Sequence, residues 1–104
     1  MKLKQLEQVS ICGYKFKMIW NKAHSGGSFH IGDRKIEIGV SQLKANPEIV
    51  FMILLHELSE IIHMIINTRY DDPSVDGNYK FFLDHKEFEN HNYILSETIL
   101  KFIN

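Results

Sequence analysis

The chain has 104 residues, 44% of them hydrophobic and 24% charged, which suits one globular domain and is too short for two separate cores. Its formal net charge of −1 removes the main electrostatic argument for nucleic acid or an acidic membrane as a partner. A single cysteine excludes an intrachain disulfide, and the longest apolar run, 49–55, is too short to span a membrane. We therefore expect one soluble domain over residues 1–104, in the cytoplasm and without a membrane anchor.

The first part of the chain predicts strands. Apolar and polar residues alternate over 14–20, which is typical of a half-buried strand. A second alternation over 35–40 follows the apolar residues Phe29 and Ile31, and Gly32-Asp33 between them suits a tight turn. The first dozen residues predict no definite element. These patterns favour a small, largely antiparallel sheet of about three strands with one apolar face.

A long helix should follow. Asn46-Pro47-Glu48 combines a good N-cap residue, a proline suited to the first helical position and a carboxylate that complements the helix dipole. No helix-breaking residue occurs from there to about Thr68, a length of roughly six turns. Turn-forming residues then occupy 71–77, and 79–83 favours a short extended segment.

A second helix is predicted at the C-terminus. Asp84 and Glu87 have the spacing of a capping box, and apolar residues at helical spacing run from Phe88 to Phe102. Strands that precede helices indicate an α+β fold. We expect the small antiparallel sheet to pack on the long helix, with the C-terminal helix alongside.

The centre of the long helix carries the residues suited to chemistry. His56, Glu60 and His63 fall on one stripe of this helix, opposite its apolar arc. Residues four apart are neighbours, so Glu60 can share one metal ion with His56. His63 lies about 10 Å from His56 along the axis, so Glu60 pairs with one histidine or the other. Glu57 flanks the stripe. The alternative interpretation is a solvated helix face stabilised by ordinary polar pairs.

His56-Glu57-Leu58-Ser59-Glu60 resembles the zincin metallopeptidase helix HExxH with its second histidine replaced by glutamate. The chain is similar to the short zincin-like proteins of phages and mobile elements that carry HExxE. The resemblance implies a minimal zincin-like fold in which His56, Glu60 and His85, near the start of the second helix, bind zinc. It implies that Glu57 is the general base and that His63 lies beside the site without binding the metal.

The function that this resemblance implies is a zinc-dependent hydrolase, in the first place a peptidase acting on a peptide or protein substrate. Glu57 would deprotonate a water and pass the proton to the leaving amine. The strand over 35–40, if it lies at the edge of the sheet, could pair with an extended peptide. The alternative is a non-catalytic zincin-like binding or scaffold module with a structural metal or none.

Overall fold

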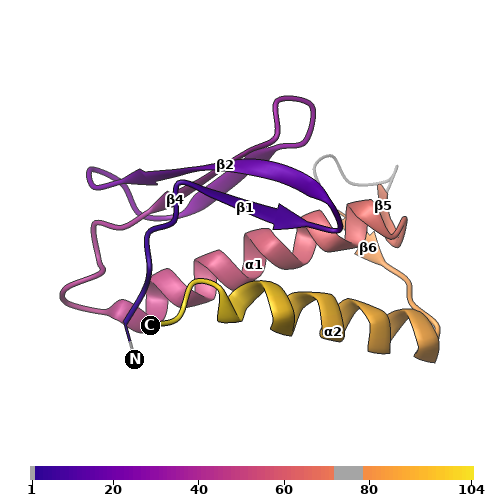
Figure 1. Ribbon diagram of the computed structural model, residues 1–104. Coiled ribbons are helices and arrows are strands. Elements are labelled where there is room, and N and C mark those ends of the chain that lie inside the picture. The colour runs from indigo at the N-terminus through magenta and orange to yellow at the C-terminus, as the bar shows by residue number, and fades with distance from the viewer. Residues whose placement is uncertain (1, 72–78) are drawn as a thin grey trace.

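A computed structural model describes residues 2–71 and 79–104, in which a sheet forms one layer and two antiparallel helices form the other (Figure 1). The turns predicted over 71–77 lie outside the described residues apart from Asp71. No helix in the described ranges is long and apolar enough to cross a membrane. The elements are β1 (Gln8–Ile11), β2 (Tyr14–Asn21), β3 (Gly27–His30), β4 (Lys35–Gly39), α1 (Pro47–Ile65), β5 (Arg69–Asp71), β6 (Tyr79–Phe81) and α2 (His85–Leu100).

The main sheet has the strand order β1-β2-β4-β3, which confirms the predicted α+β class. Its outer pairs, β1–β2 and β3–β4, are antiparallel, whereas β2 and β4 are parallel. The pairing is mixed because the chain leaves β2, forms β3 at the far edge and returns as β4 between them. The loop before β3 crosses close to Gly39, where a Cβ atom would clash with the His24 carbonyl oxygen.

This strand order corrects one expectation. The segment 35–40 was expected as a strand to which a peptide could add, but β4 is flanked by β2 and β3 and has no free edge. The edges of this sheet are β1 and β3 instead. A hairpin prediction from local turn residues cannot tell which of its two strands will pair with a third strand. The free edge near α1 therefore belongs to β3, which contacts α1 directly.

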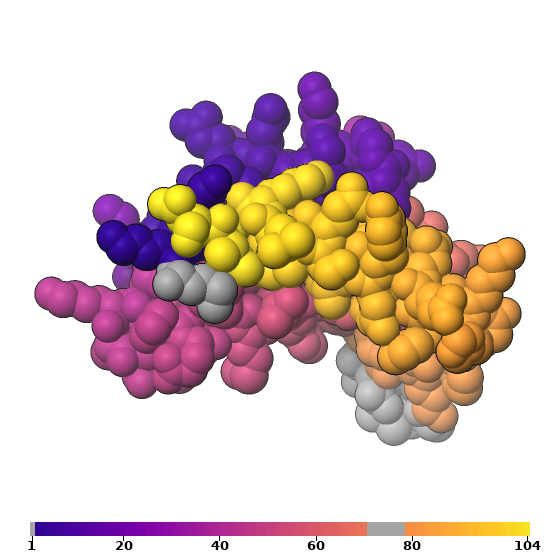
Figure 2. Space-filling model, turned by 60° about the horizontal axis from the view of Figure 1, so that its bottom comes forward, coloured from indigo at the N-terminus to yellow at the C-terminus, as the bar shows by residue number. Residues whose placement is uncertain are grey.

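The core lies between the sheet and α1, as the apolar arc of the helix predicts. Its largest fully buried side chains include Leu54, Leu58, Ile61 and Ile62 of α1, and Phe16, Ile36 and Ile38 of the sheet. In α2 the apolar stripe is only partly buried, because Phe88 at its start is 52% exposed. Figure 2 shows α2 filling the space between the N-terminal strands and α1 on that face.

The end of α1 determines which segment lies beside the helix face that carries His56, Glu60 and His63. The helix ends at Ile65, three residues earlier than predicted, because Asn67 adopts a left-handed conformation with φ 62°. Asparagine tolerates that conformation better than most residues, and helices commonly end this way. The Thr68 amide then donates to the His63 carbonyl oxygen at 2.8 Å. The chain therefore turns back, and β5 runs beside α1.

The predicted capping box of α2 is confirmed. The Glu87 amide donates to Asp84 Oδ1 at 2.8 Å, and the Asp84 amide donates to Glu87 Oε1 at 3.1 Å. Asp84→Ala removes one of these bonds and should lower the free energy of unfolding by about 0.5–2 kcal/mol. Urea denaturation measures this change. Glu97→Ala, on the same helix and exposed, is the control and should stay within about 0.5 kcal/mol of the wild type.

Candidate metal centre

The structure pairs Glu60 with His56 and so decides between the two pairings that the sequence allowed. His56 Nε2 lies 2.9 Å from Glu60 Oε2, one turn apart on α1. The His56 side chain is 66% exposed and that of Glu60 only 18%. An incoming ion could therefore reach the imidazole from solvent, while the carboxylate is held against the protein.

Glu57 lies next to this pair but is buried, with only 6% of its surface exposed. The edge strand β3 covers it: a Cβ atom on Gly27 would lie 2.9 Å from Glu57 Cγ and 2.8 Å from Ile53 Cγ2. Any larger residue at position 27 would push β3 away from the helix. Glycine at this position therefore lets the strand lie directly on the Glu57 side chain.

The three side chains form one group. Ligand-type atoms of His56, Glu57 and Glu60 all lie within 4.8 Å of one another. Burial raises the pKa of Glu57 above its ordinary value of 4.5, and the neighbouring Glu60 carboxylate acts in the same direction. Positive charge on His56 and Arg69 opposes this rise. The pKa of Glu57 is raised overall, so this carboxyl group takes up a proton more readily than an exposed glutamate does.

A pocket opens in front of the group, between β3 and α1. It has a volume of about 290 Å³. Its lining residues are Gly27, Met52, Ile53, His56 and Glu57. Two of the three members of the group therefore border a space that a small molecule or a peptide side chain could enter, beside the free edge of β3.

Arg69 completes the surroundings of the group, and its position was not predicted from the sequence. Its Nη2 lies 3.7 Å from Glu60 Oε1, the carboxylate oxygen that does not contact His56. The guanidinium lies 3.5 Å from the ring centroid of Tyr79 and 5.7 Å from that of Phe29, and Nη1 contacts the Met64 sulfur at 2.9 Å. Helical periodicity could not predict this arrangement, because Arg69 belongs to β5.

His63 does not contact Glu60 among the described interactions. Its Nδ1 lies 2.8 Å from Thr68 Oγ1, and its ring stacks on that of His91 at a centroid distance of 4.2 Å. His91 Nε2 in turn lies 2.9 Å from Ser59 Oγ. His63 therefore joins α1 to α2. The resemblance implied that His63 lies beside the site without being a ligand; besides His56, the described ion-pair partner of Glu60 is Arg69.

His85 lies outside the group. Its side chain is 84% exposed at the start of α2, and its Nδ1 lies 3.4 Å from Glu89 Oε1. The structure brings together three of the four predicted site residues, namely His56, Glu57 and Glu60. Binding of a metal by His85 stays a prediction.

The donor atoms fit a divalent ion such as zinc. Two ligand atoms at about 2.0–2.1 Å from a tetrahedral zinc lie about 3.3 Å apart. His56 Nε2 and Glu60 Oε2, at 2.9 Å, need to separate only slightly to reach that spacing. An imidazole nitrogen with a carboxylate oxygen is also a donor combination that zinc accepts. The free oxygen of Glu60 is already oriented by Arg69, as bound carboxylates commonly are.

Fold and site together define a small α+β domain with a His/Glu/Glu group on its long helix that could hold a metal ion. Comparisons with protein-family models, curated proteins and solved structures found no match to the chain. The function is therefore argued from the geometry of the group.

Proposed function

We propose that the protein is a metal-dependent hydrolase, with zinc as the metal and peptides as the substrate class. His56 and Glu60 would hold the ion, and His85 is the proposed third ligand. The observation that carries the proposal is the position of Glu57. A buried carboxyl group with a raised pKa lies beside a ready pair of metal ligands and borders an open pocket.

When bound, a zinc ion would polarise the substrate carbonyl and make a nearby water more acidic. Glu57 would accept a proton from that water as the water oxygen bonds to the carbonyl carbon. It would then give the proton to the amine nitrogen as the C–N bond breaks. Burial shifts the pKa of Glu57 upward, which is the direction that favours the uptake of the proton in the first step.

The edge strand β3 supports a peptide as the substrate. Its partner β4 occupies one side only, so backbone groups on the other side are free of the main sheet. An extended peptide added at this edge would pass the pocket that His56 and Glu57 border. This proposal assigns to β3 the role that the sequence suggested for 35–40.

A second candidate function is a non-catalytic binding or scaffold module. It is favoured by one observation: Glu60 already lies between two partners, the His56 imidazole at 2.9 Å and the Arg69 guanidinium at 3.7 Å. Such a network can neutralise the partly buried carboxylate without any metal. The two functions differ in whether the zinc-loaded protein hydrolyses peptides, and a protein that binds no zinc would already exclude the hydrolase.

Zinc titration by calorimetry tests the metal centre. Wild-type protein should bind one zinc ion per chain, and His56→Ala and Glu60→Gln should each weaken binding by roughly tenfold or more, since each loses or weakens a ligand. His24→Ala removes an exposed histidine that is not part of the group; it is the matched control and should bind zinc as the wild type does. His85→Ala tests the third ligand in the same way. Failure of the wild type to bind stoichiometric zinc would contradict the hydrolase and favour the scaffold module.

A further inference from the structure

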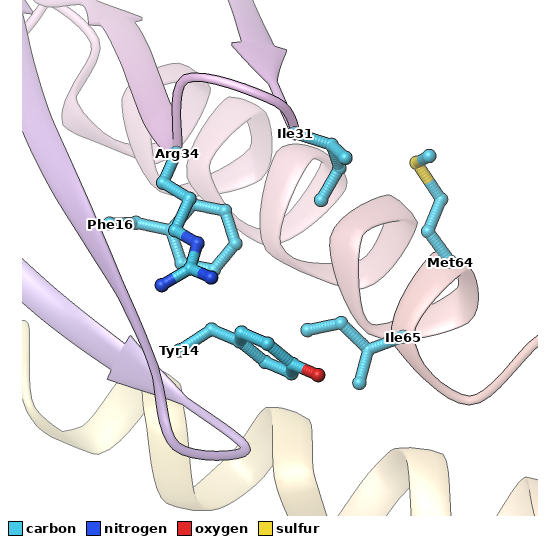
Figure 3. A pocket seen from close by; sticks show the side chains of 6 residues that line it. All are labelled: Tyr14, Phe16, Ile31, Arg34, Met64 and Ile65. Atoms are coloured by element: carbon cyan, nitrogen blue, oxygen red, sulfur yellow. The ribbon is translucent and has the colours of Figure 1, made fainter.

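A second pocket lies where the sheet and α1 diverge, and none of its lining residues belongs to the His56-Glu57-Glu60 group. It is formed by the start of β2, the turn between β3 and β4, and the last turn of α1 (Figure 3). Its volume is about 370 Å³, at the small end of the range for pockets that bind small molecules. Its lining residues are Tyr14, Phe16, Ile31, Arg34, Met64 and Ile65.

The pocket has one cationic group. The Arg34 guanidinium lies over the Tyr14 ring, 5.0 Å from its centroid. The ion pairs found within residues 2–71 and 79–104 do not include Arg34, so its hydrogen-bond donors are not used by a carboxylate there. Arginine pairs with carboxylates through two parallel hydrogen bonds. The charge at the pocket therefore complements an anionic group.

The remaining lining is mainly apolar. Phe16 closes the inner side and is 1% exposed, while Ile31 at the outer side is 37% exposed. Figure 3 shows Ile31, Met64 and Ile65 on the side opposite Arg34, with the hydroxyl of Tyr14 pointing toward Ile65. A ligand that filled the space would cover apolar surface on one side and meet a cation on the other.

The turn between β3 and β4 sets the position of Arg34. Arg34 has φ 51°, a left-handed conformation that disfavours residues with a long side chain. The strand pairs Phe29↔Ile36 and His30↔Lys35 fix the two sides of the turn and so set the position of Arg34.

We propose that this pocket binds a small apolar monocarboxylate of the class of a medium-chain fatty acid. The carboxylate pairs with the Arg34 guanidinium, and the hydrocarbon body covers Ile31, Met64 and Ile65. The volume admits a body of about ten carbon atoms and excludes a two-chain lipid. No residue of the pocket belongs to the metal group, so this binding goes beyond the proposed hydrolase and does not depend on zinc.

Calorimetry with hexanoate, octanoate and octan-1-ol tests the proposal. The titrations are run in EDTA, so that a carboxylate cannot bind through a metal ion. Octanoate should bind more tightly than hexanoate by about three- to fourfold for each added methylene, as expected for buried CH₂ groups. Octan-1-ol has the same chain without the charge and should bind at least about tenfold more weakly.

Variants then locate the binding. Arg34→Asn removes the charge with a residue that tolerates the left-handed conformation, and it should weaken octanoate binding by about tenfold or more. Lys35→Gln removes the neighbouring positive charge, which does not line the pocket, and should leave the affinity unchanged. Arg34→Lys keeps the charge and should retain part of the binding, which separates loss of charge from loss of fold.

Four results would overturn the proposal. They are absence of octanoate binding to the wild type, equal binding of octanoate and octan-1-ol, an Arg34→Asn variant that binds like the wild type, and tighter binding of a short peptide ending in leucine. The last would assign the pocket to a peptide terminus rather than a free acid. None of these four results affects the zinc titration, so the proposals for the metal centre and for this pocket are tested independently.

Discussion

Glu57→Gln should fold, bind zinc with nearly wild-type affinity and lose peptide hydrolysis by about 10²- to 10⁴-fold. Glutamine preserves the size of the side chain in its buried position under β3 but cannot accept a proton from water. The factor is the usual contribution of a general base. Zinc-loaded protein is incubated with a mixture of synthetic peptides, and the products are followed by mass spectrometry.

The pH profile gives this prediction a second readout. The base must be ionised to act, so kcat/KM should fall as the pH is lowered through the pKa that Glu57 has in the zinc-loaded enzyme. Glu48→Gln, an exposed carboxylate in the first turn of the same helix, is the matched control and should keep full activity. An active Glu57→Gln variant would show that the base lies elsewhere. A Glu57→Gln variant that loses zinc would show that Glu57 is a ligand.

Much of the fold could be predicted because local patterns match the structure closely. The capping box at Asp84 predicted the start of α2, and Asn46-Pro47 predicted where α1 begins, although the Asn46 side chain makes no capping hydrogen bond and its amide donates to Gln42 Oε1 instead. Both signals act within a few residues and do not depend on the rest of the chain. The order of the strands could not be predicted from such local signals. Parallel pairing of β2 with β4 depends on how the loop crosses Gly39, a contact between segments far apart in sequence.

The candidate site was likewise predictable only in part. His56, Glu57 and Glu60 come together because one regular helix sets their spacing, so the sequence was enough. Gly27 and Arg69 reach the same group from β3 and β5, and no pattern within their own segments indicates it. The sequence also showed no reason for the burial of Glu57, which follows from the position of the edge strand rather than from the helix.

A stacked pair of histidines joins the two helices and links stability to pH. Burial lowers the pKa of His63 from 6.5 to about 4, and positive charge on His91 acts in the same direction. His63 is 7% exposed and stacks on His91 from α2, with Phe81 of β6 at a centroid distance of 4.4 Å. Protonation of His63 would therefore place a charge among packed rings where α1, α2 and β6 meet.

The sign of the effect follows from the two pKa values. Between pH 6.5 and about 4 the unfolded chain binds a proton at His63 that the folded protein does not, so stability falls as the pH is lowered through this window. The full loss at pH 4 is about 3 kcal/mol, and stability is unaffected by His63 above pH 6.5. Glu57 acts in the opposite direction, because its raised pKa lets the folded protein hold a proton that the unfolded chain has released.

Denaturation of the metal-free protein by urea at a series of pH values from 4 to 7 measures the balance. His63→Asn places an amide where Nδ1 contacts Thr68 and cannot titrate, so its stability should depend less on pH than that of the wild type. In the Glu57→Gln background the opposing titration is absent, so the net loss of stability between pH 7 and pH 4 should be larger. Parallel profiles for wild type and His63→Asn would show that the histidine stack accepts a proton without opening, and that the contact between the helices does not sense acid.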